Sequence, residues 1–256
     1  WFGTESGIVK ISNRLHAGVE GGLEDFVVGT MFENQMGDVF SINETRTGVI
    51  WFGTLLGLYR HVPGKWRTLD ERTGLTNTAI TYICETSPGD FFFGTTRGLF
   101  QYHQCVWKLF DDKSGLANNF VKAILATKDG DLWVGTLGGG AQRFSKRRWS
   151  HFDEHNGLAD NRVYSILRSD NGALWFATSR GVSQFYQGNW RTLTTADGLV
   201  GNQVLSLYES GDGATWFGTR SGLSRLHHGV WQSFTTANGL AGNVVHSING
   251  FSDGSL

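Results

Sequence analysis

The sequence predicts an all-β fold, a β-propeller whose four-stranded blades repeat about every 41 residues. A tetrapeptide close to Trp-Phe-Gly-Thr recurs along the chain at nearly constant spacing. Glycine makes up 36 of the 256 residues and proline only 2, which favours short strands joined by tight turns. Between successive copies lie four short apolar or β-branched segments, enough for one blade. The six copies begin at residues 1, 51, 92, 133, 175 and 216.

Several positions of the repeat hold the same residue in every copy. Threonine recurs three residues after the first aromatic residue, and glycine recurs six residues after it and three before it. Five copies carry a second tryptophan, followed eight residues later by Gly-Leu. All 10 tryptophans thus occupy repeat positions, which predicts a structural role for them, with Trp175 and Trp216 buried between blades. A structural role is also expected for the crossover asparagines Asn119, Asn161, Asn202 and Asn243.

Each strand of a blade has its own signal, as the copy at 163–202 illustrates. Residues 163–168 are apolar and β-branched, which suits the innermost strand. Ser-Asp-Asn-Gly at 169–172 is typical of a hairpin turn, in which glycine supplies a positive φ. Two further glycine-containing turns follow before the chain crosses to the next copy. The four strands are expected at 163–168, 174–178, 182–186 and 190–193.

The two ends of the chain carry unequal pieces of the repeat, within one propeller domain expected over 1–256. The chain opens on a second strand at 1–4 and closes on an inner strand with its turn at 245–256. The last strand could pair with the first and close a six-bladed ring, or the chain is a fragment of a larger propeller; both interpretations stay open. The first copy is longer than the others, and a degenerate outer strand with a long loop is expected over 12–36.

Composition excludes several classes of function. Lys plus Arg is 22 and Asp plus Glu is 23, a balance that argues against nucleic-acid binding and against a polybasic membrane anchor. No apolar run is long enough to insert into a bilayer. Cys84 and Cys105 fall on strands too far apart for a disulfide and are expected to be free thiols.

One motif suggests metal chemistry but falls in the wrong place for it. His151-Phe-Asp-Glu-His155 matches a zinc-protease pattern, which requires a helix to bring both histidines to one face. Here the segment is expected on an outer strand and the following crossover. We therefore predict no metal site, no cofactor and no catalytic residue.

Candidate binding residues should lie where the repeats differ, because one asymmetric ligand needs different residues from different blades. The copies differ in the turn after the second strand, where three of them place Arg97, Arg180 and Arg220. These turns and the crossovers, which include Arg162, are expected to share one rim, and guanidinium groups bind carboxylates and sugar hydroxyls well. A solvated charged turn is the alternative. His246 is expected on an inner strand near the central channel, either lining it or packed.

The repeat resembles that of the two-component regulator propeller family. The resemblance rests on Gly198-Leu-Val-Gly-Asn-Gln-Val204, Asp212-Gly-Ala-Thr-Trp-Phe-Gly-Thr219 and Gly222-Leu-Ser-Arg225, and it extends over nearly the whole chain. It implies a sensor domain on the periplasmic or extracellular side of a membrane-bound receptor whose output is a histidine kinase or diguanylate cyclase. Propellers of that family usually have seven blades.

The resemblance implies recognition of a small molecule, often an oligosaccharide, by a chain that is not itself an enzyme. A second copy of the parent receptor is a further possible partner, through self-association, and this alternative stays open. Two other functions are kept as alternatives. One is a propeller enzyme similar to streptogramin lyases, which would need an acid/base pair such as His246 with a carboxylate. The other is a scaffold for protein interactions.

Overall fold

The computed structural model describes residues 2–4, 7–14, 25–31, 37–45, 47–62, 65–68, 74–75 and 77–250. In this part of the chain the fold is all-β, as predicted: one three-stranded and five four-stranded antiparallel sheets. In every four-stranded sheet the spatial order of the strands follows the chain order, so each sheet is a meander. The described helices are two three-residue 3₁₀ turns, Asp112–Ser114 and Thr236–Asn238, and neither has the length to cross a bilayer.

The strands fall at the repeat positions. The first sheets contain β1 (Phe2–Thr4), β2 (Gly7–Arg14) and β3 (Asp25–Met31); β4 (Val39–Glu44), β5 (Ile50–Thr54), β6 (Gly57–Val62) and β7 (Lys65–Thr68); and β8 (Ile80–Ser87), β9 (Asp90–Thr95), β10 (Gly98–His103) and β11 (Val106–Phe110). The later sheets contain β12 (Val121–Ala126), β13 (Leu132–Thr136), β14 (Ala141–Ser145) and β15 (Arg148–Phe152); β16 (Val163–Arg168), β17 (Leu174–Thr178), β18 (Gly181–Tyr186) and β19 (Asn189–Leu193); and β20 (Val204–Glu209), β21 (Thr215–Thr219), β22 (Leu223–His227) and β23 (Val230–Phe234).

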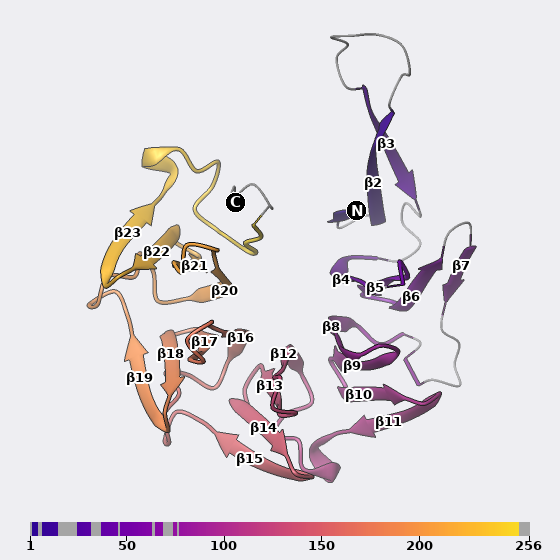
Figure 1. Cartoon of the computed structure of the whole chain (residues 1–256), viewed down its shortest axis with the longest axis horizontal. Helices are drawn as coiled ribbons and strands as arrows, with labels where there is room; N and C mark the ends of the chain where they lie inside the picture. Colours follow the sequence, from indigo (N-terminus) through magenta and orange to yellow (C-terminus); the bar gives the residue numbers. More distant parts are fainter. Residues whose placement is uncertain are drawn as a thin grey trace. The chain divides into compact units, whose positions relative to one another are not determined.

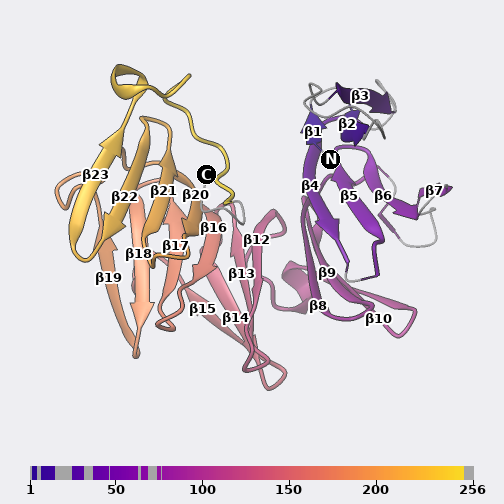
Figure 2. The ribbon, with the colours of Figure 1, turned by 45° about the horizontal axis from the view of Figure 1, so that its top comes forward.

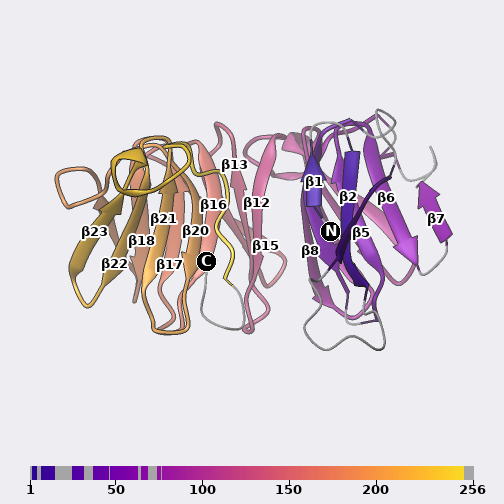
Figure 3. The ribbon, with the colours of Figure 1, turned by 90° about the horizontal axis from the view of Figure 1, so that it is seen from above.

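The chain divides into two compact units. One comprises residues 1–96 and 100–108, and the other comprises 97–99 and 109–256. In the second unit the sheets that begin with β12, β16 and β20 stand side by side, with these three strands adjacent and innermost (Figures 1 and 2). Figure 3 shows the strands of these sheets running roughly along one direction. The expectation of a single domain over 1–256 stays a prediction.

The recurring threonine and glycine form one turn together. The Thr178 hydroxyl donates a 2.7 Å hydrogen bond to the carbonyl of Gly181 and accepts one from the backbone N–H of Arg180. Gly181 has a φ of +134°, a conformation that side-chain-bearing residues rarely adopt. The same side-chain bond occurs in three other repeats, from Thr54, Thr136 and Thr219. The recurring threonine therefore has a structural role in this turn.

The crossover between blades is held by the other recurring residues. The side-chain oxygen of Asn161 accepts a 3.0 Å hydrogen bond from the backbone N–H of Glu154, seven residues earlier. The same bond is made by Asn119, Asn202 and Asn243. Gly157 has a φ of +137°, and a Cβ at this position would collide with the indole of Trp190. Gly-Leu and the second tryptophan recur together because the indole of the second tryptophan in the next copy packs over the glycine, as Trp190 does over Gly157.

Gly157→Ala is expected to lower the free energy of unfolding by roughly 2–3 kcal/mol, because it combines backbone strain with a clash against Trp190. Gly172→Ala is the matched control. Gly172 also has a positive φ, +87°, but no atom lies within 4 Å of its Cβ position. That substitution should cost only about 1 kcal/mol of backbone strain. Equal costs in urea unfolding would contradict this explanation of the Gly–Trp pairing.

The core lies between the sheets, as expected for blades that are covered on both faces. Trp175 is 5% exposed and meets the fully buried Phe217 of the next sheet edge-on, with ring centroids 5.5 Å apart. The prediction of burial is confirmed for Trp175 but wrong for Trp216, which is only half-buried. Trp216 packs on Phe234 of its own sheet and under the guanidinium of Arg225. The described residues after β23 form no sheet that would cover it.

The strand expected at 245–256 is not formed over its described part. Residues 244–250 have no strand conformation, although the backbone N–H of Val245 donates a 2.9 Å hydrogen bond to Thr219. In the other repeats the inner strand exists because it pairs with the second strand of its own sheet, and 244–250 make no such pairing. Residue 1 and residues 251–256 lie outside the described residues. The three-stranded sheet β1-β2-β3 has no fourth strand among them, so ring closure stays open.

The expectation for the first copy is met in part. The outer strand is present as β3, which pairs with β2 from Ile8 to Arg14. The expected long loop falls largely on 15–24 and 32–36, outside the described residues.

Candidate functional site

The turn after the second strand lies against the start of the innermost strand of the same sheet. The backbone N–H of Arg220 donates a 3.1 Å hydrogen bond to the carbonyl of Gln203, which immediately precedes β20. Leu55 makes the equivalent bond to Asp38, and Leu137 to Phe120. The loops that vary among repeats therefore share one edge of each sheet, as predicted for the crossovers and these turns.

In the second unit this edge carries a cluster of three charged side chains. Asp160, in the crossover before β16, is 5% exposed. Its Oδ1 lies 3.2 Å from Nε of Arg162, and its Oδ2 lies 3.4 Å from Nε of Arg180. The carboxylate also accepts a 2.8 Å hydrogen bond from the backbone N–H of Arg162, which fixes its orientation. One buried carboxylate thus holds two guanidinium groups from two different loops.

Electrostatics keep this carboxylate charged. Burial alone would raise the pKa of Asp160, but hydrogen bonds from its neighbours, Arg162 among them, hold that pKa below its usual range. The two arginines are 56% and 70% exposed, so water screens their outer edges. Both contacts with Asp160 use Nε, and the terminal amino groups of each guanidinium remain as donors for an oxyanion or a hydroxyl.

The pKa shift has a consequence that can be measured. A carboxylate whose pKa is lower in the folded than in the unfolded state adds stability at high pH, and this is lost as pH falls through the folded pKa. Asp160→Asn should therefore lower the melting temperature near neutral pH, and the gap to wild type should narrow below about pH 4. A gap that stays constant into strong acid would contradict the charge assignment.

The edge continues toward the next sheet through polar groups. The side-chain amide of Gln203 donates a 3.2 Å hydrogen bond to the hydroxyl of Tyr164. Tyr164 follows Val163 at a β-bulge, and the first strand of every four-stranded sheet has a bulge at this position. In β12 the equivalent residue is Lys122, and burial lowers the pKa of its ammonium group. The bulge positions therefore add residues that differ between repeats.

The structure places the five predicted site residues unequally. It brings Arg162 and Arg180 together on Asp160, and Arg220 lies in the equivalent turn of the next sheet in the same unit. Arg97 lies exposed in the β9–β10 turn. The inner strand expected to carry His246 is not formed, and the side chain is exposed; a role for His246 in binding stays a prediction.

Sequence reasoning missed Asp160. The signal was available, because the crossover position that holds Asp160 has asparagine or glycine in the other regular copies. Asp160 is therefore an exception to the repeat, and it lies two residues before Arg162. The other arginine, Arg180, lies in the turn after the second strand of the same sheet. Its partnership with Arg180 still depends on the turn folding back onto the crossover.

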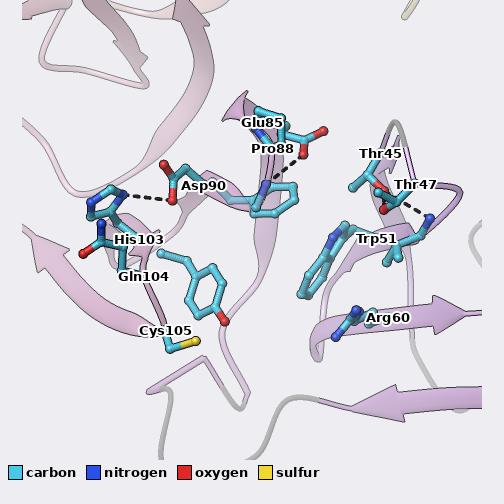
Figure 4. A pocket seen from close by; sticks show the side chains of 14 residues that line it. Thr45, Thr47, Trp51, Arg60, Glu85, Pro88, Asp90, His103, Gln104 and Cys105 are labelled. Carbon is cyan, nitrogen blue, oxygen red and sulfur yellow. Dashed lines mark hydrogen bonds and ion pairs between the residues drawn. The ribbon is translucent and has the colours of Figure 1, made fainter.

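A second feature, also missed, is a cavity of about 720 Å³ in the first unit. It lies between the sheet β4–β7 and the sheet β8–β11 and has aromatic walls from Trp51, Phe91 and Tyr102. Figure 4 shows Arg60 and Trp51 on one side of it and residues of the other sheet, Glu85 and Asp90 among them, opposite. An oxygen of Asp90 lies 2.9 Å from Nδ1 of His103.

The motif with two histidines has the location expected for it. His151 lies on the outermost strand β15, and its Nε2 is 2.8 Å from the carbonyl oxygen of Gly139. His155 follows in the crossover, beside Asp153. No group of three metal-ligating side chains occurs in the described part of the chain. Cys84 and Cys105 are not joined in a disulfide, as predicted.

Comparison with known proteins agrees with the repeat analysis. The family model described as two component regulator propeller matches residues 115–138, 157–180 and 198–221. Three of the six copies therefore match the two-component regulator propeller repeat, and the predicted resemblance is confirmed. No curated protein matches the sequence.

Solved structures confirm the propeller fold. The extracellular domain of a hybrid two-component system from B. thetaiotaomicron aligns with a TM-score of 0.82 at 22% identity, over 99% of this chain and 35% of that one. This chain thus spans about a third of that structure. A catalytically inactive virginiamycin B lyase from Staphylococcus aureus with quinupristin aligns with a TM-score of 0.66 at 14% identity, over 94% and 78% of the two chains. At these identities the likeness concerns the fold alone.

Proposed function

We propose that this chain, with its two-component regulator propeller repeats, is a ligand-recognition domain of a membrane-bound signalling receptor and lies outside the cytoplasm. The proposed ligand is an acidic oligosaccharide bound at the edge that carries Arg162 and Arg180. The similarity of the repeats and of the fold to a hybrid two-component extracellular domain supports this class. In this proposal the chain binds its ligand and performs no catalysis of its own.

The observation that carries the proposal is the arginine pair held by Asp160. Two guanidinium groups with fixed Nε contacts present terminal donors from neighbouring loops, so little side-chain entropy is left to lose when an anion binds. These loops belong to the variable part of the repeat, where one asymmetric ligand would need its contacts. A uronate carboxylate would bind the donors, and adjacent hydroxyl groups would reach Tyr164 or Arg220.

A lyase-like activity has less support. It would require an acid/base pair, and the histidine considered for that role, His246, is exposed on a segment without strand structure. The virginiamycin B lyase likeness, at 14% identity, carries the fold and not the chemistry.

Calorimetry with two matched probes tests the proposal. Trigalacturonate should bind, and its affinity should fall with rising salt, whereas the neutral maltotriose should bind at least roughly tenfold more weakly. The recovered trigalacturonate should be unchanged after prolonged incubation. Equal affinity for both probes, or no binding of either, would contradict the acidic-ligand proposal. Cleavage of the probe would replace recognition with catalysis.

A further inference from the structure

The cavity in the first unit contains two buried donors that find no acceptor in the described part of the chain. Trp51 is 6% exposed, and among the described residues its indole N–H has no hydrogen-bond partner. The same holds for Nε of Arg60, whose guanidinium carbon lies 5.5 Å from the centre of the Trp51 ring. Two unpaired N–H groups against an aromatic wall are costly, because each loses its hydration without replacement.

The other repeats show which groups normally satisfy these donors. The indoles of Trp175 and Trp216 donate to serine hydroxyls, at 2.9 Å to Ser169 and 3.0 Å to Ser210. The repeat position of those serines is held by Thr45, whose hydroxyl instead pairs with Thr47 and accepts from the backbone N–H of Val49.

The arginine facing the tryptophan is normally paired with a carboxylate. Arg143, opposite Trp133, donates from Nε to Asp131 at 2.8 Å. In the sixth copy, Arg225 donates a 2.6 Å hydrogen bond to Asp212. Asp212 lies two residues earlier in the repeat than the position that Asp131 holds. The second copy has an acid at neither position.

In the second copy these two positions hold Val49 and Thr47. The described residues give Arg60 no ion pair. The repeat therefore indicates that the missing partner of Arg60 is a carboxylate.

The opposite wall of the cavity carries an acidic residue where the corresponding wall in a later sheet carries a basic one. The place between β12–β15 and β16–β19 that corresponds to this cavity is only about 150 Å³, and there Arg168 pairs with Asp129 at 3.4 Å. The residue equivalent to Arg168 is Glu85. One oxygen of Glu85 accepts a hydrogen bond from the backbone N–H of Gly89, and no cation of the described residues pairs with it. Among the described residues, this side of the cavity therefore lacks a cationic partner for Glu85.

We propose that this cavity binds a small zwitterion with an apolar body, namely an apolar amino acid or a short peptide with free ends. Its carboxylate binds Arg60 as Asp131 binds Arg143, and it accepts a hydrogen bond from the indole N–H of Trp51. Its ammonium group faces Glu85, and its apolar side chain lies between Trp51, Phe91 and Tyr102. The volume of about 720 Å³ is in the range of small-molecule sites. The site is formed by the first unit alone and differs from the arginine pair in the second.

Calorimetry with phenylalanine and the dipeptide Phe-Leu tests this site. At least one of them should bind, and acetylation of its amine or amidation of its carboxylate should each weaken binding roughly tenfold or more. Free and blocked forms that bind equally, or no binding of either zwitterion, would overturn the proposal. Maltotriose is included as a neutral competitor, and displacement of the zwitterion by maltotriose would also overturn it.

Val49→Asp provides the sharper variant. It installs the carboxylate that the equivalent position holds in Asp131, so Arg60 gains an internal partner and binding should be lost. The melting temperature should stay equal or rise, which separates lost binding from misfolding. Val230→Asp, the same change at an exposed position of β23, should leave affinity unchanged. Wild-type affinity in Val49→Asp would overturn the assignment of Arg60.

Discussion

Trp175→Ala is expected to lower the free energy of unfolding by about 3–5 kcal/mol, the range for deleting a large buried aromatic side chain. The indole is buried between two sheets, contacts Phe217 edge-on and donates its N–H to Ser169. Truncation would leave a cavity and an unpaired serine hydroxyl. Urea unfolding monitored by circular dichroism measures the change.

Trp216→Ala is the comparison, because it removes the same side chain from the same repeat position. Trp216 is only half-buried, so its loss should cost clearly less than the loss of Trp175. Acrylamide quenching of the native protein should likewise reach Trp216 and spare Trp175. Equal costs, or free quenching of Trp175, would contradict the packing described for the second unit.

Replacing both Arg162 and Arg180 with alanine is expected to reduce trigalacturonate affinity by at least roughly a hundredfold, since each charge-assisted contact is worth about 1.5–3 kcal/mol. Both side chains are more than half exposed, but the double change leaves the buried Asp160 carboxylate without its two guanidinium partners, so a loss of stability of about 1–3 kcal/mol is expected. Calorimetric titration of wild type and double variant measures the loss.

A double variant that removes arginines elsewhere is the control. Arg191→Ala with Arg148→Ala changes two exposed arginines on the outer strands β19 and β15 and removes the same net charge. Affinity should remain close to wild type. An equal loss in both double variants would mean that net charge, and not the site, governs binding.

The fold could be predicted closely because its determinants recur. Thr178 and Gly181 form their turn within four residues, and Asn161 reaches only seven residues back, so their interactions depend on local sequence. Local signals of this kind appear in copy after copy. The strands predicted for 163–193 agree with β16 to β19 to within one residue at each end.

The features that could not be predicted depend on packing between segments. Trp216 is half-buried and His246 lies on no strand because 244–250 make no strand pairing. The sequence of 244–250 alone does not show whether such a pairing forms. Arg180 was expected to be open to ligand, and its contact with Asp160 arises from folding between loops 20 residues apart. The cavity likewise appears only when Val49 and Glu85 from two copies are placed across from each other.

Hydrogen exchange with bound trigalacturonate tests the central claim most directly, that recognition uses the loops in which the repeats differ. The account predicts slower exchange on binding in the crossover 153–163 and in the turn 178–181, and unchanged exchange in the equivalent loops of the fourth copy, 111–121 and 136–140. Protection spread equally over the equivalent loops of all copies, or confined to the outer strands β15 and β19, would contradict it.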